Sequence, residues 1–142
     1  MTVERVGDVT DEVVQAFARL VPQLSPGRVP PTRDELSALL AQPGVELLAA
    51  LDDGRVLGML TLVVYRIPSG VKARIEAVVV DESARGRGVG ELLTREAMSR
   101  AVAAGAQRVE LTSRPARETA NRLYPRLGFE RQETNVYVWR PG

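Results

Sequence analysis

The 142-residue chain contains no cysteine and no histidine, and only 4% of its residues are aromatic. Without cysteine there is no disulfide, no thiolate nucleophile and no zinc site built on sulfur. Without histidine the chain lacks the commonest general base and the commonest neutral metal ligand. Ser-His hydrolases, Cys-His transferases and histidine-ligated metalloenzymes are therefore excluded. Any acid–base chemistry must use Asp, Glu, Tyr, Lys or water, and we expect no metal.

A strong net charge and a long apolar run are also missing. The formal charge is +1 at pH 7, which predicts no general affinity for nucleic acid or membranes. No apolar run approaches the ~20 residues of a membrane-spanning helix, and nothing at the N-terminus resembles a signal peptide. We therefore expect a cytoplasmic protein without nucleic-acid or membrane partners. The length predicts one domain, residues 1–142, with a sizeable core.

The most informative stretch comprises residues 78–90. Three consecutive valines predict a strand, the glycine-rich residues 85–90 predict a loop, and the residues that follow predict a helix. Glycine lets the backbone approach a ligand closely, and the first N–H groups of a helix have no internal partner and can bind phosphate oxygens. Arg85 and Arg87 add positive charge that suits phosphate. The stretch therefore predicts an anion-binding site.

The spacing within this loop distinguishes several kinds of phosphate site. A P-loop ends in Gly-Lys-Ser/Thr, whereas this loop ends in Gly90-Glu91. A dinucleotide fingerprint counted from Gly86 and Gly88 needs a small residue where Glu91 stands. The pattern that fits is Arg-x-x-Gly-x-Gly from Arg85 to Gly90, which resembles the pyrophosphate loop of the GCN5-related N-acetyltransferase (GNAT) superfamily. The alternative is a glycine-rich surface turn with solvated arginines.

Hydrophobic periodicity and turn residues predict the elements along the chain. Asp8 or Thr10 can cap the first helix, Thr32 to Glu35 form a capping box for the second, and Asp53-Gly54 predicts a tight turn. We expect a strand at 2–6, helices at 10–20 and 32–40 around a proline-rich loop at 22–31, antiparallel strands at 45–51, 55–65 and 71–80, a helix at 88–104, a strand at 107–112 parallel to 71–80, a helix at 116–127, and strands at 129–133 and 135–139. This β-α-α-β-β-β-α-β-α-β-β order resembles the GNAT fold. That fold is a single-domain α/β (α+β) architecture with a mixed, mostly antiparallel sheet of six to seven strands and about four helices.

A second landmark lies at residues 120–129, Ala-Asn-Arg-Leu-Tyr-Pro-Arg-Leu-Gly-Phe. It resembles the family's Asn…Tyr…Gly-Phe stretch, in which the Asn side chain and the Tyr hydroxyl face the coenzyme. The resemblance therefore implies coenzyme contacts for Asn121 and Tyr124. Pro125 departs from the pattern, because proline inside a helix removes the hydrogen bond to the carbonyl of Asn121.

The resemblance implies an N-acetyltransferase that moves an acetyl group from acetyl-CoA directly to a primary amine of a small molecule or of a peptide or protein. The pantetheine arm is implied to pair with the valine strand as an added strand would. The implied coenzyme-binding residues are Val78, Val79, Val80, Arg85, Gly86, Arg87, Gly88, Val89, Gly90, Asn121 and Tyr124. Acceptor specificity should come from the loops and edges at 22–33, 66–70 and 129–139, which carry no recognisable signature.

Glu76 is the leading candidate for the general base. Strand alternation predicts Arg74, Glu76, Val78 and Val80 on one face, so that Glu76 faces with the coenzyme-pairing residues. The stretch Ile-Glu-x-x-x-Val resembles GNAT members whose Glu at this point acts as a base, often through water. The alternative is a solvated Glu76 paired with Arg74 or with a charge on a neighbouring strand.

Tyr124 is the candidate that would donate a proton or a hydrogen bond to the leaving thiolate. Its alternative role is to pack its ring against Leu127 and Phe129. Two other functions also fit the loop: a non-catalytic acyl-CoA sensor or regulatory module, and a nucleotide-binding module. The missing P-loop and dinucleotide signatures disfavour the nucleotide-binding module, and we expect a monomer or a homodimer.

Overall fold

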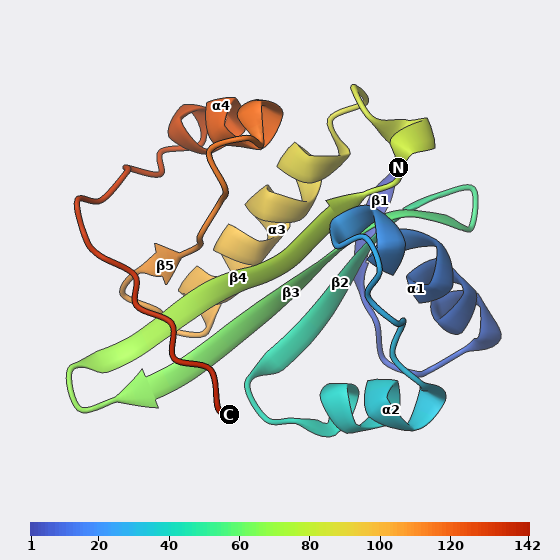
Figure 1. Ribbon diagram of the computed structural model, residues 1–142, viewed down its shortest axis with the longest axis horizontal. Coiled ribbons are helices and arrows are strands. Elements are labelled where there is room, and N and C mark those ends of the chain that lie inside the picture. Colours follow the sequence, from blue (N-terminus) through green and yellow to red (C-terminus); the bar gives the residue numbers. More distant parts are fainter. The chain divides into compact units, whose positions relative to one another are not determined.

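The computed structural model describes residues 1–142 and contains two compact units, residues 1–112 and 113–142 (Figure 1). The first unit contains β1 (Thr2–Arg5), α1 (Asp11–Leu24), α2 (Arg33–Ala41), β2 (Val45–Asp52), β3 (Arg55–Ile67), β4 (Gly70–Val80), the 3-10 turn η1 (Glu82–Ala84), α3 (Val89–Ala103) and β5 (Val109–Glu110). The second unit contains α4 (Glu118–Arg126). The expectation of one domain over residues 1–142 stays a prediction.

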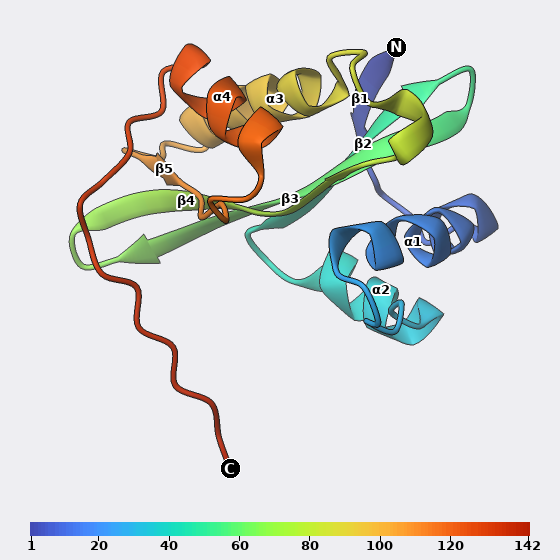
Figure 2. The same cartoon turned by 45° about the horizontal axis from the view of Figure 1, so that its top comes forward.

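The first unit is built on a five-stranded sheet in the order β1-β2-β3-β4-β5. Strands β1 to β4 are antiparallel neighbours. β5 pairs in parallel with β4, as predicted, but only through Ala73↔Val109 and Arg74↔Glu110. Helices α1 and α2 cover one face of the sheet and α3 covers the other (Figure 2). None of the helices has the length and hydrophobicity required to cross a bilayer.

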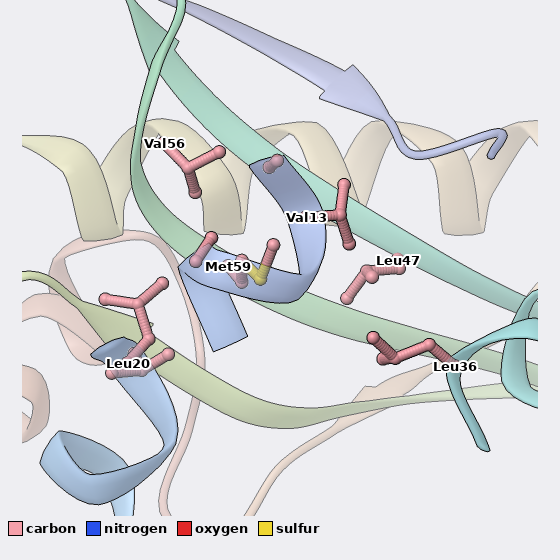
Figure 3. Close-up of a cluster of buried hydrophobic side chains, with 9 residues drawn as sticks. Val13, Leu20, Leu36, Leu47, Val56 and Met59 are labelled. Atoms are coloured by element: carbon pink, nitrogen blue, oxygen red, sulfur yellow. The ribbon is translucent and has the colours of Figure 1, made fainter. Parts of the chain in front are cut away.

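The main core lies between the sheet and the helices α1 and α2. Figure 3 shows side chains from both helices and from β2 and β3 gathered there; the cluster includes Val13, Leu20, Leu36, Leu47, Val56, Met59 and Val79. Burying a side chain of this size contributes ~1.5–3 kcal/mol. On the opposite face α3 packs very closely on β3, because a Cβ at Gly58 would lie 3.0 Å from Val89 Cγ1 and 3.2 Å from Leu93 Cδ1.

The predicted starts of α1 and α2 are confirmed, while the predicted end of α1 is wrong. Thr10 caps α1 by accepting a hydrogen bond from the Val13 N–H, and Thr32 and Glu35 form the expected capping box of α2. The proline-rich loop was predicted from residue 22, yet α1 continues through Pro22 to Leu24. Pro22 costs the helix one hydrogen bond, and the buried side chains of Leu20 and Val21 hold this last turn against the core.

Strand β4 contains a bulge that changes which residues share a face. Thr61 pairs with Glu76 and Met59 pairs with Val79, so one extra residue stands on β4 between the two pairs. Ala77 takes up the extra residue with a left-handed φ of 52°, which is rare for a residue with a Cβ. The predicted alternation therefore fails here, because Glu76 shares its face with Val79 and not with Val78 or Val80.

The two predicted closing strands, residues 129–133 and 135–139, are wrong, since no strand follows α4. The sheet therefore has five strands instead of the six or seven expected. Tyr137 and Trp139 are 87% and 84% exposed. The β-branched and aromatic residues of this segment favour extended backbone, but a strand also needs a hydrogen-bonding neighbour. β5 is likewise shorter than the predicted 107–112, and α4 begins at Glu118 instead of 116.

Candidate functional site

The loop between η1 and α3 has the backbone geometry of an anion site. Gly86 and Gly88 have φ values of 81° and 79°, which only glycine adopts at low cost. Gly88 is the N-cap of α3 and provides no side-chain cap, and the first N–H to donate backwards is that of Leu92, to the Gly88 carbonyl (3.0 Å). A Cβ at Gly86 or Gly88 would meet nothing within 4 Å. The start of α3 is therefore uncapped and faces open space, which suits a phosphate.

The two arginines of the loop differ in their ion pairing. Arg85 is exposed and enters no ion pair. Arg87 lies 2.6 Å from Asp52 at the end of β2, measured from Nη2 to Oδ2. This hydrogen bond is the main reason that the pKa of Asp52 is lowered from its ordinary 3.8. Arg85 is thus available to an anion, whereas Arg87 must first leave a carboxylate.

No strand pairs with the part of β4 next to the loop on its β5 side. β5 pairs with β4 only at Ala73 and Arg74, so no strand lies beside residues 75–80 on that side. The opposite side of β4 pairs with β3 up to Val80. The predicted pantetheine-binding residues Val78, Val79 and Val80 therefore stand on a strand edge that leads directly toward the glycine loop.

Glu76 is half exposed on the same face as Thr61 and Val79. Its Oε1 accepts a hydrogen bond from Arg74 Nε at 3.1 Å, and Arg74 Nη1 also lies 3.6 Å from Glu110 Oε2. The pairing with Arg74 that was the alternative to catalysis is therefore present. It does not exclude a base, because the other carboxylate oxygen has no partner in this pair; the catalytic role stays a prediction.

Asn121 and Tyr124 belong to the second unit, whereas all the other predicted site residues belong to the first. Asn121 Nδ2 donates to the Arg114 carbonyl at 2.8 Å, which fixes the loop before α4. Tyr124 is 8% exposed, and its ring meets that of Phe129 edge-on at 5.7 Å. Burial raises the pKa of Tyr124 above 10.0, with the charge of Arg117 opposing the shift, so the hydroxyl stays protonated at neutral pH.

Sequence reasoning missed three polar residues that support the loop: Asp52, Arg19 and Asp81. Asp81 follows β4 directly and is 4% exposed, and Arg19 Nε lies 2.7 Å from its Oδ2. An acidic residue directly after a valine strand was a visible signal for Asp81. Its partner lies 62 residues away in the sequence, and no local pattern identifies such a partner.

Comparison with known proteins agrees with this geometry. The model of the acetyltransferase (GNAT) family matches residues 11–129. The chain belongs to the GNAT family. It is 33% identical over 100 residues to the aminoalkylphosphonate N-acetyltransferase of Salmonella typhimurium, an alignment that covers 69% of this chain and 65% of the relative.

Solved structures show the same mixed α+β GNAT fold. One is the aminoglycoside acetyltransferase meta-AAC0020 from an uncultured soil metagenomic sample, in complex with sisomicin (TM-score 0.84, 19% identity, 99% of this chain and 95% of that chain). Another is AAC(6')-Iy in complex with the bisubstrate analogue CoA-S-monomethyl-acetylneamine (TM-score 0.77, 19% identity, 99% and 97%). At 19% identity each, these two structures support the fold.

Proposed function

We propose that the chain transfers an acetyl group from acetyl-CoA directly to a primary amine of a small molecule or peptide. The observation that carries this proposal is the uncapped start of α3, reached through two left-handed glycines with open space beside them. The first N–H groups of a helix have no partner within the helix, and they favour a phosphate by hydrogen bonding and by the helix dipole. Arg85 adds the charge that a pyrophosphate requires.

The strand edge beside the loop suits the pantetheine arm of the coenzyme. An extended arm lying along residues 75–80 would pair with β4 where β5 no longer does. The pyrophosphate would then reach the glycine loop, since the strand edge and the loop belong to one continuous stretch of chain. Acetyl-CoA supplies the acetyl group as a thioester, and the chain has no cysteine that could carry the group as an intermediate.

Two side chains are assigned to proton transfer in this proposal. Glu76 accepts the proton of the amine, directly or through water, as the amine nitrogen bonds to the thioester carbonyl carbon. Tyr124 donates a hydrogen bond or a proton to the sulfur as the carbon–sulfur bond breaks. The raised pKa of Tyr124 supports this role, because the hydroxyl keeps its proton at neutral pH.

The charges around Glu76 favour an acceptor that carries both an amine and an anionic group. Strand register places Lys72 and Arg74 on the same face as Glu76. Lys72 enters no ion pair in the structure and is available to an anion. The Salmonella relative is named for aminoalkylphosphonates, which carry both groups. We therefore propose a small amine of this type over a polycationic aminoglycoside.

Thiol release with a panel of amines tests the proposal. The purified chain is incubated with acetyl-CoA and either an aminoalkylphosphonate, a peptide amine or sisomicin, and acetylated product is identified by mass spectrometry. We expect coenzyme A and N-acetylated product in equal amounts, with the aminoalkylphosphonate as the better acceptor. Binding of acetyl-CoA without turnover on any amine would indicate the acyl-CoA sensor instead.

A further inference from the structure

Side chains from α1 hold the corner between β4 and the glycine loop. Asp81 uses both of its carboxylate oxygens there: Oδ1 accepts from the Ser83 N–H at 3.1 Å, and Oδ2 accepts from Arg19 Nε at 2.7 Å. One helical turn after Arg19, Gln23 Oε1 accepts from the Glu82 N–H at 2.9 Å. Two adjacent residues of the corner are therefore each held by a side chain of α1.

The same side chains are also fixed to the sheet and to each other. Arg19 Nη2 donates to the Val56 carbonyl on β3 at 2.6 Å. Gln23 Nε2 donates to the Arg19 carbonyl at 3.2 Å, as expected for residues four apart on one helix face. The Asp81 N–H donates to the Leu57 carbonyl at 2.8 Å. The corner is thus joined to α1 and β3 at once, and its geometry is defined by several bonds.

The corner leads into the coenzyme loop with little freedom in between. Asp81 is the N-cap of η1, which ends at the fully buried Ala84, and Arg85 follows immediately. Burial alone would raise the pKa of Asp81, but the hydrogen bonds from Ser83 and Arg19 outweigh it and lower the pKa below 3.8. The carboxylate is therefore kept charged as an acceptor, and a buried charge that loses its partner is strongly destabilising.

We propose that Arg19, Gln23 and Asp81 are positioning residues that aim the pyrophosphate loop, so that α1 controls coenzyme affinity without contacting the coenzyme. This inference rests on the proposed function, because it takes the loop as the pyrophosphate site. It predicts that loosening the corner weakens the binding of only those acetyl donors that carry a pyrophosphate. A general loss of structure would weaken the binding of every acetyl donor.

The test compares acetyl-CoA with S-acetylpantetheine, which keeps the thioester and the pantetheine arm but lacks the pyrophosphate. Gln23→Leu removes the bonds to Glu82 and to the Arg19 carbonyl. Arg19→Lys keeps the charge but replaces the two donor nitrogens that bind Asp81 and the Val56 carbonyl by a single ammonium nitrogen. We expect each variant to raise the KM for acetyl-CoA about fivefold, the effect of roughly one lost hydrogen bond. We expect kcat, and the KM for S-acetylpantetheine, to stay within about twofold.

Arg100→Lys is the matched control. Like Arg19, Arg100 uses two guanidinium nitrogens: Nε donates to Glu96 at 3.0 Å and Nη1 donates to Glu46 at 2.8 Å. Neither partner belongs to the corner or to the glycine loop. The KM values of this control variant should match the wild type for both donors. The proposal would be overturned if the Gln23 and Arg19 variants raised the KM equally for acetyl-CoA and S-acetylpantetheine. It would also be overturned if they raised neither KM.

Calorimetry with coenzyme A and with pantetheine separates this inference from the proposed function. If the wild type binds coenzyme A but acetylates no amine, the proposed function fails, and the binding constants of the Gln23 and Arg19 variants still decide the positioning role. A wild type that does not bind coenzyme A overturns both. Asp81→Asn is left as a secondary variant because its buried position risks unfolding, whereas Gln23 lies at the end of α1.

Discussion

Glu76 shares its sheet face with Thr61 and Val79, and its carboxylate accepts a hydrogen bond from Arg74. We expect Glu76→Gln to lower kcat/KM for the amine by about 10²–10³, the contribution of one positioned acid–base group, while leaving coenzyme affinity unchanged. Steady-state kinetics and calorimetric titration with coenzyme A would measure the two effects.

Glu46→Gln is the matched control for this prediction. Glu46 is also a partly exposed carboxylate on a sheet strand, and it is bonded to an arginine, Arg100, at 2.8 Å. Its register partner is Leu62, two residues from Leu60, which places it on the face of the sheet opposite Glu76. Equal losses of kcat/KM in the two variants would reassign Glu76 to structure.

Tyr124 presents a neutral hydroxyl on a ring that also packs against Phe129. Tyr124→Phe keeps the ring and removes only the oxygen, so a hydrogen bond formed in the transition state should appear as a loss in kcat of about tenfold or more, with unchanged coenzyme binding. Because burial raises the pKa of Tyr124, its hydroxyl keeps its proton across the neutral range and activity there should not fall through its ionisation. Tyr65→Phe, at a tyrosine of β3 outside the predicted site, is the control, and wild-type kcat in Tyr124→Phe would leave the residue with packing alone.

At the scale of the element, the two ends of α3 offer a matched pair of glycines. Gly88 before the helix and Gly105 after it have φ values of 79° and 87°, and a Cβ at either would meet nothing within 4 Å. Glu at either position therefore carries the same backbone strain, of about 1–2 kcal/mol. We expect similar melting temperatures for Gly88→Glu and Gly105→Glu, but loss of acetyl-CoA binding only in Gly88→Glu, because only there does a carboxylate face the phosphates. Normal calorimetric binding by Gly88→Glu would place the coenzyme elsewhere.

The hairpin between β2 and β3 competes with phosphate for Arg87. Asp52 holds the guanidinium at 2.6 Å, so Arg87 must give up this pair before it reaches a pyrophosphate. Asp52→Asn should therefore tighten acetyl-CoA binding about two- to fivefold, as expected for an exposed ion pair. Asp53→Asn is the control, since Asp53 has a φ of 50° that Asn tolerates and it makes no ion pair with Arg87. Weaker binding in Asp52→Asn would mean that the pair preorganises the loop instead.

At the scale of the whole molecule, most of the predictions that succeeded depend on near neighbours in sequence; the parallel pairing of β5 with β4 is an exception. Helix caps at Thr10 and Thr32 and the turn at Asp53-Gly54 involve residues within a few positions. The glycine loop was found for the same reason, because its backbone, charge and helix start lie in one short stretch. These features need no knowledge of the rest of the fold.

The predictions that failed depend on partners far away in the sequence. The last turn of α1 is held by the core despite Pro22, and the bulge at Ala77 appears only in the register of β4 against β3. The loop's supporting partners Asp52 and Arg19 are 35 and 62 residues from the groups they bind. Periodicity describes each segment separately, so it detects neither a bulge nor a distant partner.

The fluorescence of Trp139 tests whether residues 135–139 form the predicted strand. Trp139 is the only tryptophan in the chain and lies in that segment. It is 84% exposed, and Val136 and Tyr137 beside it are also exposed. We expect fluorescence emission close to that of free tryptophan in water and efficient quenching by acrylamide, neither of which changes with protein concentration. Emission shifted to the blue at all concentrations would mean that residues 135–139 pair within their own chain after all. A blue shift that appears only as concentration rises would mean that a second copy covers the segment, since an exposed run of valine and aromatic residues is suited to strand pairing.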